Sequence, residues 1–388
     1  MEKTKSYLAK TVEELKPSGI RRFFDLAAGM EGVISLGVGE PDFVTSWSVR
    51  EAAILSLEQG YTSYTANAGL LELREEIANY MEDNFDVSYS PNSEIIVTVG
   101  ASQALDIALR AIVDPGDEII VVEPCFVSYA PLVALAGGKP VTVHTNEEND
   151  FKLSAIELEQ SITNRTKAII LCSPNNPTGT MLNKEDLEAI ATVAEKYDLL
   201  VLADEIYAEL SYDEKFVSFA AIEGMRKRTI LISGFSKGFA MTGWRLGFVC
   251  APEEISQAML KIHQYAMMCA STMAQFAALE ALKHGRDDVI EMRKSYRRRR
   301  NYFVQSLNDI GLECHIPGGA FYAFPSIKST GLTSEQFAEK LLIEEKVAVV
   351  PGAVFGESGE GYIRCSYASS MEQLQESIKR IKSFLDRL

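Results

Sequence analysis

The sequence predicts an α/β protein with a large domain, built on a mostly parallel seven-stranded sheet between helices, and a small α+β domain. Between residues 93 and 250, seven short apolar segments alternate with helical stretches, as in sheets covered on both faces. After about residue 285 this alternation ends. The 388 residues also exceed the size at which one hydrophobic core stops growing. We therefore expect a large domain at 46–285, a small domain at 286–388, and an N-terminal segment, 1–45, that joins the small domain.

Each expected strand is a short, nearly continuous apolar run, which is typical of strands buried on both faces. In chain order the runs are EIIVTVG (94–100), DEIIVVE (117–123), KPVTVHT (139–145), KAIILCS (167–173), LLVLADE (199–205), RTILISG (228–234) and WRLGFVC (244–250). Helices are expected from Ser102, after Phe126 and over 184–196. Beyond residue 285 we expect a long amphipathic helix, extended segments at 347–356 and 361–368, and a helix over 371–387.

The net charge argues against nucleic acid or an anionic membrane as a partner. The chain has 38 basic and 54 acidic residues, a net charge of −16, which repels phosphate backbones and anionic headgroups. The basic run RKSYRRRR (293–300) fits a solvated helix face or a subunit contact better than an anion site. Six cysteines form no C-x-x-C pair, and there is no signal-peptide core or long uncharged apolar segment. We expect a cytoplasmic protein with reduced thiols.

Polar and small residues follow four of the expected strands, at the edge where ligands bind in open α/β sheets. They are Gly100-Ala101-Ser102, Asn176 in SPNNPTG, Asp204 with Tyr207 in ADEIY, and Lys237 in SGFSKGFAMTGWRLG. Backbone N–H groups at a helix start bind phosphate, and burial in a turn rich in glycine and phenylalanine would make the Lys237 amine nucleophilic. Taken singly, each feature also fits an ordinary helix start, turn, cap or exposed loop.

Together, the four features supply the parts of a site for pyridoxal phosphate (PLP). A lysine amine forms a Schiff base with the cofactor aldehyde, a buried acid keeps the ring nitrogen protonated, and a helix start holds the phosphate. A hydroxyl and an amide beside the phenolic oxygen of the ring complete the set. The combination therefore predicts a PLP-dependent enzyme.

The motifs SPNNPTG, ADEIY, SGFSKGFAMTGWRLG and GYIRCSYA closely resemble those of class I PLP-dependent aminotransferases of the fold type I group. The resemblance is to bacterial and archaeal aspartate and aromatic aminotransferases, over nearly the whole chain from SLGVGEPDF (35–43) onwards. A weaker similarity, in SGIR (18–21) and SYTANAGLLELR (63–74), is to bacterial N-acetyl-diaminopimelate aminotransferase. The resemblance implies ping-pong transfer of an amino group from an L-amino acid to a 2-oxo acid, most often 2-oxoglutarate. The donor stays open between aspartate, aromatic amino acids, alanine and N-acetyl-diaminopimelate.

The resemblance also implies a role for each matching residue. Lys237 looks like the Schiff-base lysine and proton shuttle, with Asp204 on the ring nitrogen and Tyr207 and Asn176 on the phenolic oxygen. Arg245 looks like the phosphate ligand with Ala101, Ser102 and Ser236, and Phe126 like the residue that stacks on the ring. Arg364, Gly39 and Asn176 look like the substrate-binding residues. Tyr64 matches a tyrosine that reaches the phosphate of the neighbouring subunit, which implies a homodimer with shared active sites.

Two positions depart from the family pattern. Three residues before the lysine, many relatives have a phosphate-binding serine, but this chain has Gly234, and we expect Ser236 rather than Ser233 to substitute. The ring-stacking residue is Phe126 where relatives often have Trp or Tyr, which alters the strength of stacking without removing it. Arg21 or Arg22 fits either a contact to a distal substrate carboxylate or a solvated helix charge.

Several other classes of protein share parts of this sequence pattern. PLP-dependent carbon–sulfur lyases share Lys237, Asp204, Tyr207 and Arg364, so the product of the reaction must separate the two. PLP-binding transcription regulators, which are not enzymes, need a helix-turn-helix domain, and about 30 residues ahead of SLGVGEPDF are too few for one. G-V-G at 37–39 lacks the third glycine of a dinucleotide fingerprint. No histidine pair has metal-ligand spacing and no G-x-S-x-G elbow occurs, so we expect neither a metal site nor a serine hydrolase.

Overall fold

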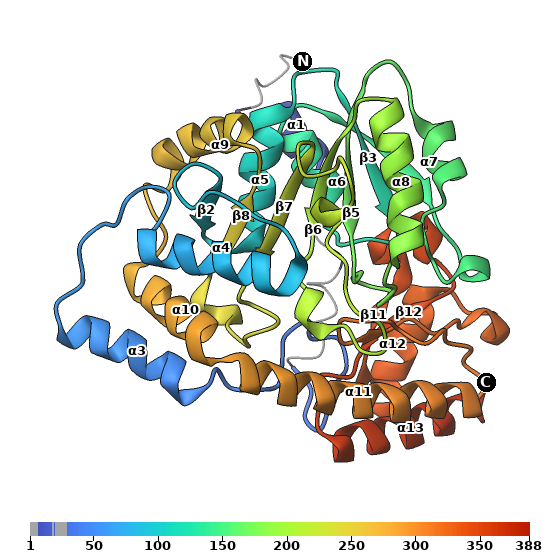
Figure 1. Cartoon of the computed structure of the whole chain (residues 1–388). Coiled ribbons are helices and arrows are strands. Elements are labelled where there is room, and N and C mark those ends of the chain that lie inside the picture. The colour runs from blue at the N-terminus through green and yellow to red at the C-terminus, as the bar shows by residue number, and fades with distance from the viewer. Residues whose placement is uncertain (1–6, 18, 20–28) are drawn as a thin grey trace.

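The computed structural model describes residues 7–17, 19 and 29–388, and a seven-stranded sheet lies at its centre (Figure 1). The strand order is β2–β8–β7–β6–β5–β3–β4, and all strands run parallel except β8, which is antiparallel to both of its neighbours. The strands are β2 (Ile95–Thr98), β3 (Glu118–Glu123), β4 (Lys139–His144), β5 (Thr166–Cys172), β6 (Leu200–Asp204), β7 (Thr229–Gly234) and β8 (Gly247–Cys250). The mostly parallel seven-stranded sheet predicted from the sequence is thereby confirmed.

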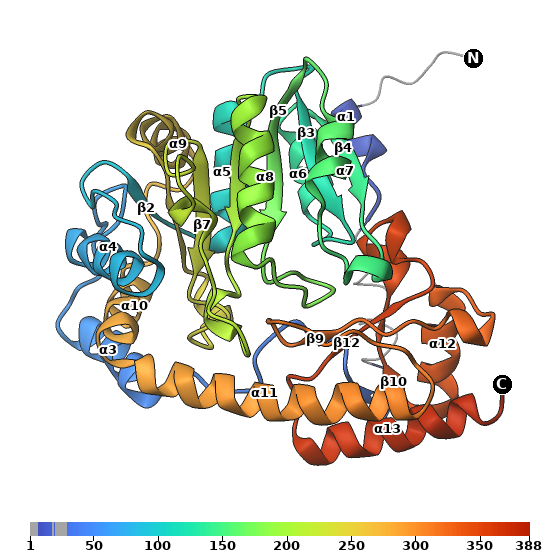
Figure 2. The same cartoon turned by 45° about the vertical axis from the view of Figure 1, so that its right-hand side comes forward.

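Helices cover both faces of the sheet (Figure 2). One face carries α5 (Gly100–Ile112), α6 (Tyr129–Leu135) and α9 (Glu253–Ala266). The other face carries α7 (Ala155–Ser161) and α8 (Lys184–Lys196). On the same face, α4 (Leu71–Phe85) and α10 (Thr272–His284) cover β2, β7 and β8. The helix α3 (Trp47–Glu58) packs against α10. Alternate residues of β7 serve the two faces, since Ile230 and Ile232 pack against α5 while Leu231 packs on the opposite side. Double-sided burial explains why most of the strands are largely apolar, whereas the edge strand β4 is largely exposed and carries Lys139, Thr142 and His144.

The chain beyond residue 285 forms smaller sheets and long helices beside the carboxyl ends of the central strands. A three-stranded antiparallel sheet has the order β11–β12–β9, and β1 pairs with β10 in a parallel pair. Because β1 belongs to the N-terminal segment, residues 34–35 add to this part of the fold. The domain boundaries at 45 and 285 stay predictions. The elements are β1 (Ile34–Ser35), α11 (Arg286–Asp309), β9 (Tyr322–Ala323), α12 (Ser334–Glu345), β10 (Val347–Ala348), β11 (Val350–Pro351), β12 (Ile363–Ser366) and α13 (Met371–Leu385).

Two expected elements differ from those observed. The run 244–250 enters β8 only at Gly247, because Thr242–Trp244 forms a 3-10 turn and Arg245 has a positive φ of 52°. This left-handed residue ends the turn two positions before the strand begins. The segment 347–356 is extended only in β10 and β11, after which Gly352–Phe355 forms another 3-10 turn.

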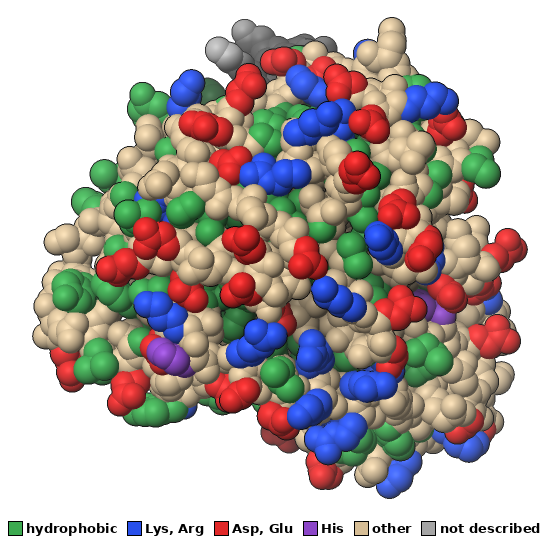
Figure 3. Space-filling view, viewed as in Figure 1, with side chains coloured by type: hydrophobic (Ala, Val, Ile, Leu, Met, Phe, Trp, Pro, Cys, Tyr) green, Lys and Arg blue, Asp and Glu red, His purple; other side chains and the backbone are tan. Residues whose placement is uncertain are grey.

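The basic run at 293–300 is divided between the surface and the interior. Figure 3 shows lysine and arginine side chains gathered over α11 on one face of the molecule. Arg297 pairs with Asp213 at the surface, whereas the buried Arg300 donates to Asp213 and to the carbonyl of Pro317. Arg299 pairs with Asp42 from the N-terminal segment at 2.8 Å. The run therefore includes ion pairs inside one chain as well as a solvated face.

Residues 7–17, 19 and 29–388 contain neither a membrane-spanning helix nor a metal-binding cluster. Among these residues, none of the helices combines the length and the apolar character needed to cross a bilayer. The same residues contain no group of three or more histidine, cysteine or acidic side chains arranged to hold a metal ion.

Candidate active site

A pocket of about 790 Å³ lies where the carboxyl ends of the parallel strands meet β9 and β12. Parallel strands end at one edge of a sheet, so residues that follow β2, β3, β5, β6 and β7 gather there. The pocket is lined by eleven of the residues singled out in the sequence: Gly39, Ala101, Ser102, Phe126, Asn176, Asp204, Tyr207, Ser236, Lys237, Arg245 and Arg364. Its volume suits a cofactor together with a small substrate.

Asp204 is the last residue of β6 and is only 5% exposed. The hydroxyl of Tyr129 donates to its Oδ2 at 2.6 Å, and the backbone N–H of Ile206 donates to Oδ1 at 3.3 Å. Burial raises the pKa of Asp204, while these two hydrogen bonds and the nearby charge of Lys237 lower it. A buried carboxylate with donors on both oxygens is prepared to pair with a cation.

Lys237 follows β7 by three residues and lies partly buried in the pocket. Its Nζ donates to the carbonyl of Gly39 at 2.5 Å and lies 5.9 Å from the centre of the Tyr207 ring. Burial lowers the pKa of Lys237 to about 8, with Glu40 acting in the opposite direction. At pH 7 about a tenth of such an amine is neutral, compared with less than about a thousandth for an ordinary lysine. The Lys237 amine can therefore act as a nucleophile and as a base.

The start of α5 forms a positive concave site at one end of the pocket. Gly100 has a positive φ of 75°, no side chain caps the first turn, and Ala101 and Ser102 line the pocket. The guanidinium of Arg245 lies over this turn, since a Cβ on Gly100 would stand 2.8 Å from its Nη2. A helix start with free backbone N–H groups beside a guanidinium is a ready site for a phosphate.

The structure explains why residue 234 is glycine. Gly234 pairs with Gly247 across β7 and β8, and a Cβ at 234 would lie 2.7 Å from the Cα of Gly247 and 3.1 Å from the carbonyl oxygen of Leu246. A serine therefore cannot occupy this position unless the backbone moves. Ser236 lines the pocket and Ser233 does not, so of the two serines only Ser236 is in a position to face a ligand there.

Arg364, in β12, is 3% exposed and reaches the pocket from the smaller sheet. Its Nη1 donates to Oδ1 of Asn176 at 2.8 Å, and its Nη2 donates to the carbonyl of Gly37 at 2.7 Å. The guanidinium also lies 4.5 Å from the centre of the Tyr322 ring. Nε has no partner within the described part of the chain. A guanidinium has five N–H donors, so this one is held in place and still has donors for a carboxylate.

Tyr207 and Tyr322 form a hydroxyl pair in the pocket wall. Their hydroxyl oxygens are 2.9 Å apart, and burial raises the pKa of both phenols. The wall is tight at Gly39, where a Cβ would lie 2.9 Å from the Tyr322 hydroxyl. No local sequence pattern indicates that Tyr322 lines the pocket. Tyr129, also missed, follows Phe126 by one helical turn, and this spacing could have indicated a second pocket residue.

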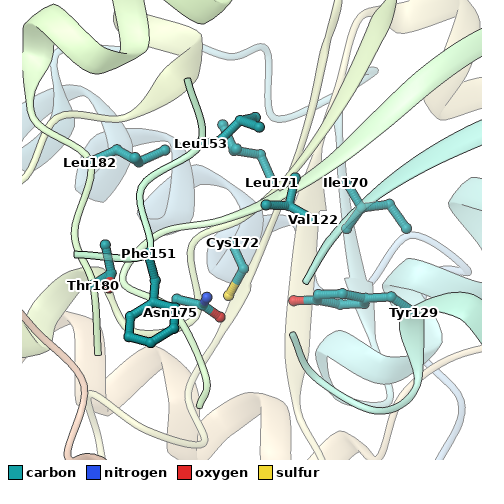
Figure 4. A pocket seen from close by; sticks show the side chains of 10 residues that line it. All are labelled: Val122, Tyr129, Phe151, Leu153, Ile170, Leu171, Cys172, Asn175, Thr180 and Leu182. Carbon is teal, nitrogen blue, oxygen red and sulfur yellow. The ribbon is translucent and has the colours of Figure 1, made fainter. Parts of the chain in front are cut away.

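A second cavity, of about 20 Å³, lies next to the main pocket and shares Tyr129 and Cys172 with it. Figure 4 shows the hydroxyl of Tyr129, the sulfur of Cys172 and the amide of Asn175 pointing toward one another. The Asn175 amide nitrogen donates to the carbonyl of Pro124 at 3.0 Å, which ties this loop to the one that carries Phe126. The cavity has room for about one water molecule. This cavity is therefore too small for a substrate.

Three further residues were singled out in the sequence: Tyr64, Arg21 and Arg22. Tyr64 is 78% exposed and does not line the pocket, so its expected role requires a second chain. Arg21 and Arg22 lie outside the described residues.

Residues 31–381 match the family model of class I and class II aminotransferases. The chain is 70% identical to the protein YugH of Bacillus subtilis (strain 168), over 98% of this chain and 99% of the relative. It is 50% identical to an aspartate aminotransferase of Pyrococcus abyssi (strain GE5 / Orsay), over 97% of this chain and 98% of the relative. A Bacillus subtilis (strain 168) protein named as a probable N-acetyl-LL-diaminopimelate aminotransferase is 47% identical over 96% of this chain and 94% of the relative. The solved aromatic aminotransferase from Pyrococcus horikoshii OT3 superposes with a TM-score of 0.90 and 47% identity, covering 95% of this chain and 99% of that one.

Proposed function

Since the chain belongs to the class I and class II aminotransferases, we propose that its pocket moves the amino group of an L-amino acid to 2-oxoglutarate, with Lys237 as the base. The protein is a PLP-dependent aminotransferase. The observation that supports the residue roles is the meeting of Lys237, Asp204 and Arg364 in one pocket of about 790 Å³.

The pocket residues fit PLP at each of its polar groups. The uncapped start of α5 and the guanidinium of Arg245 suit the phosphate. The buried carboxylate of Asp204 suits the cationic ring nitrogen of the cofactor. Phe126, which lines the same pocket, suits stacking on the cofactor ring. When bound, PLP supplies an aldehyde that captures amines and a ring that accepts electrons.

Lys237 moves the proton in this proposal. Its Nζ takes the proton from the Cα of the donor amino acid and, in the second half of the reaction, returns a proton to the Cα of the product amino acid. A pKa of about 8, caused chiefly by burial, suits both directions because the amine can take up and release a proton near neutral pH.

Arg364 binds the α-carboxylate of the substrate in this proposal. Its contacts to Asn176 and Gly37 fix the guanidinium, and the remaining N–H groups receive the carboxylate. A carboxylate held there orients the substrate's Cα toward Lys237, which lines the same pocket. Tyr207 and Asn176 would contact the phenolic oxygen of the cofactor.

An assay of products tests this function against the carbon–sulfur lyase alternative. We expect the purified protein with PLP to form a new amino acid from 2-oxoglutarate and to release no ammonia. A panel of aspartate, aromatic amino acids, alanine and N-acetyl-LL-diaminopimelate, compared by kcat/KM, identifies the donor. Release of pyruvate and ammonia from cystathionine without an oxo acid, and no transfer to 2-oxoglutarate, would show a lyase instead.

We also propose a homodimer in which Tyr64 of one chain reaches the phosphate site of the other. Large apolar side chains are exposed on this chain, including Val44 at 76%, Trp47 at 58% and Tyr265 at 94%, and a second chain could cover them. Light scattering should give twice the mass of one chain, and Tyr64→Phe should weaken PLP binding. A monomer with full activity would contradict the shared site.

The six cysteines are free thiols, which suits a cytoplasmic location that cell fractionation can test.

A further inference from the structure

A hydrogen bond between Gln103 and His263 links α5 to α9. Gln103 lies in the first turns of α5, next to the residues that we propose to bind the phosphate. The backbone N–H of Val99 donates to Oε1 of Gln103 at 2.6 Å. The amide nitrogen of Gln103 lies 2.9 Å from Nδ1 of His263, which is fully buried. Neither Gln103 nor His263 lines the pocket. Their hydrogen bonds reach the pocket through the backbone at Val99.

The chemistry of the partners fixes the orientation of the Gln103 amide. The Val99 N–H can only donate, so the amide atom facing it must be the oxygen. The amide NH₂ then faces His263, whose Nδ1 must accept and whose ring must be neutral. Burial lowers the pKa of His263, which keeps the ring neutral. A reversed amide would place NH₂ against the Val99 N–H and lose the hydrogen bond.

The turn held in this way is the one that presents the phosphate site. Val99 precedes Gly100, and the next two residues, Ala101 and Ser102, line the pocket. The Thr98 hydroxyl donates to the carbonyl of Gly100 at 3.0 Å, so side chains hold the turn from both sides. The turn has little room to move, because the guanidinium of Arg245 fills the space over Gly100. A shift of Val99 would therefore move the N–H groups that face the pocket.

We propose that Gln103 is a positioning residue for the phosphate-binding turn, and that His263 is the acceptor that fixes the Gln103 amide. This inference rests on the proposed function, because it assumes that the phosphate of PLP binds at the start of α5.

Titration of the apoprotein with PLP and with pyridoxal, which lacks the phosphate, tests the proposal. Gln103→Met removes both hydrogen bonds at nearly constant volume. We expect PLP to bind about tenfold more weakly, the equivalent of about one net hydrogen bond, and pyridoxal to bind as in the wild type. Gln257→Met, at an exposed position on α9, is the matched control and should bind both compounds normally.

A second pair of variants tests the role of His263. His263→Asn keeps an acceptor near the position of Nδ1 and should retain wild-type affinity for PLP, whereas His263→Leu should weaken it as Gln103→Met does. Equal losses for PLP and pyridoxal, or a Gln103→Met protein with normal PLP affinity, would overturn the inference. Failure of the wild-type protein to bind PLP would instead overturn the proposed function.

Discussion

Replacement of Arg364 by lysine separates recognition of the α-carboxylate from the mere presence of a positive charge. Lysine keeps the charge but offers one nitrogen where arginine offers a fork. In the structure Nη1 donates to Oδ1 of Asn176 at 2.8 Å and Nη2 donates to the carbonyl of Gly37 at 2.7 Å. In our proposal the remaining N–H groups donate to the substrate carboxylate. A single ammonium cannot satisfy these protein acceptors and also receive both oxygens of a carboxylate.

The size of the effect follows from the hydrogen bonds lost. We count two charge-assisted bonds, each contributing about 1.5–3 kcal/mol, so Arg364→Lys should lose about 3–6 kcal/mol of transition-state binding. This corresponds to a decrease in kcat/KM of about 10²- to 10⁴-fold.

The assay compares a donor amino acid with the amine that lacks its α-carboxylate. The wild type should strongly prefer the amino acid, and Arg364→Lys should reduce this preference while changing the rate with the amine little. Arg110→Lys, which replaces an arginine paired with Asp106 on the surface of α5, is the control and should leave the preference unchanged. If Arg364→Lys slowed both compounds equally, the side chain would support the fold and not the substrate.

Three further predictions concern protonation and packing. Because a protonated amine cannot attack an aldehyde, apoprotein should react with PLP faster as the pH rises through the Lys237 pKa of about 8 and level off above it. Stopped-flow absorbance measures this rate, and a flat profile would contradict the assignment. Gly234→Ser should cost about 1–3 kcal/mol of unfolding free energy, because its Cβ would lie 2.7 Å from Gly247 Cα; an unchanged denaturation midpoint would refute this. Tyr129→Phe removes the 2.6 Å hydrogen bond to Asp204, so the pKa of Asp204 should rise. As the pH is lowered, kcat/KM of the variant should therefore begin to decrease at a higher pH than kcat/KM of the wild type. An acid limb at the wild-type pH would show that this bond does not tune Asp204.

The central sheet could be predicted because its strands, except the edge strand β4, are buried on both faces and are therefore largely apolar. The site could be located for a related reason, since Asn176, Asp204 and Lys237 each follow a parallel strand and such strands end at one edge. Local sequence carries both signals. The glycine at 234 was noticed, but its cause, the backbone of β8, became visible only in the fold.

Contacts between distant segments could not be predicted. Tyr129 donates to a residue 75 positions away, the Tyr207–Tyr322 pair spans 115 positions, and Gln103 and His263 are 160 positions apart. A local pattern does not state which partner a side chain will meet. The expected strand at 244–250 began too early for a different reason. The apolar residues after Arg245 resemble the start of a strand, and no local pattern indicates the left-handed conformation of Arg245.

Borohydride reduction of the PLP-loaded protein, followed by peptide mass spectrometry, tests the role of Lys237 most directly. Reduction should remove the absorbance of the bound cofactor and fix its mass on the peptide that contains Lys237. Lys237→Ala should bind PLP without fixing it and should lose turnover by many orders of magnitude. Label on a different lysine, or near-normal turnover by Lys237→Ala, would contradict the account.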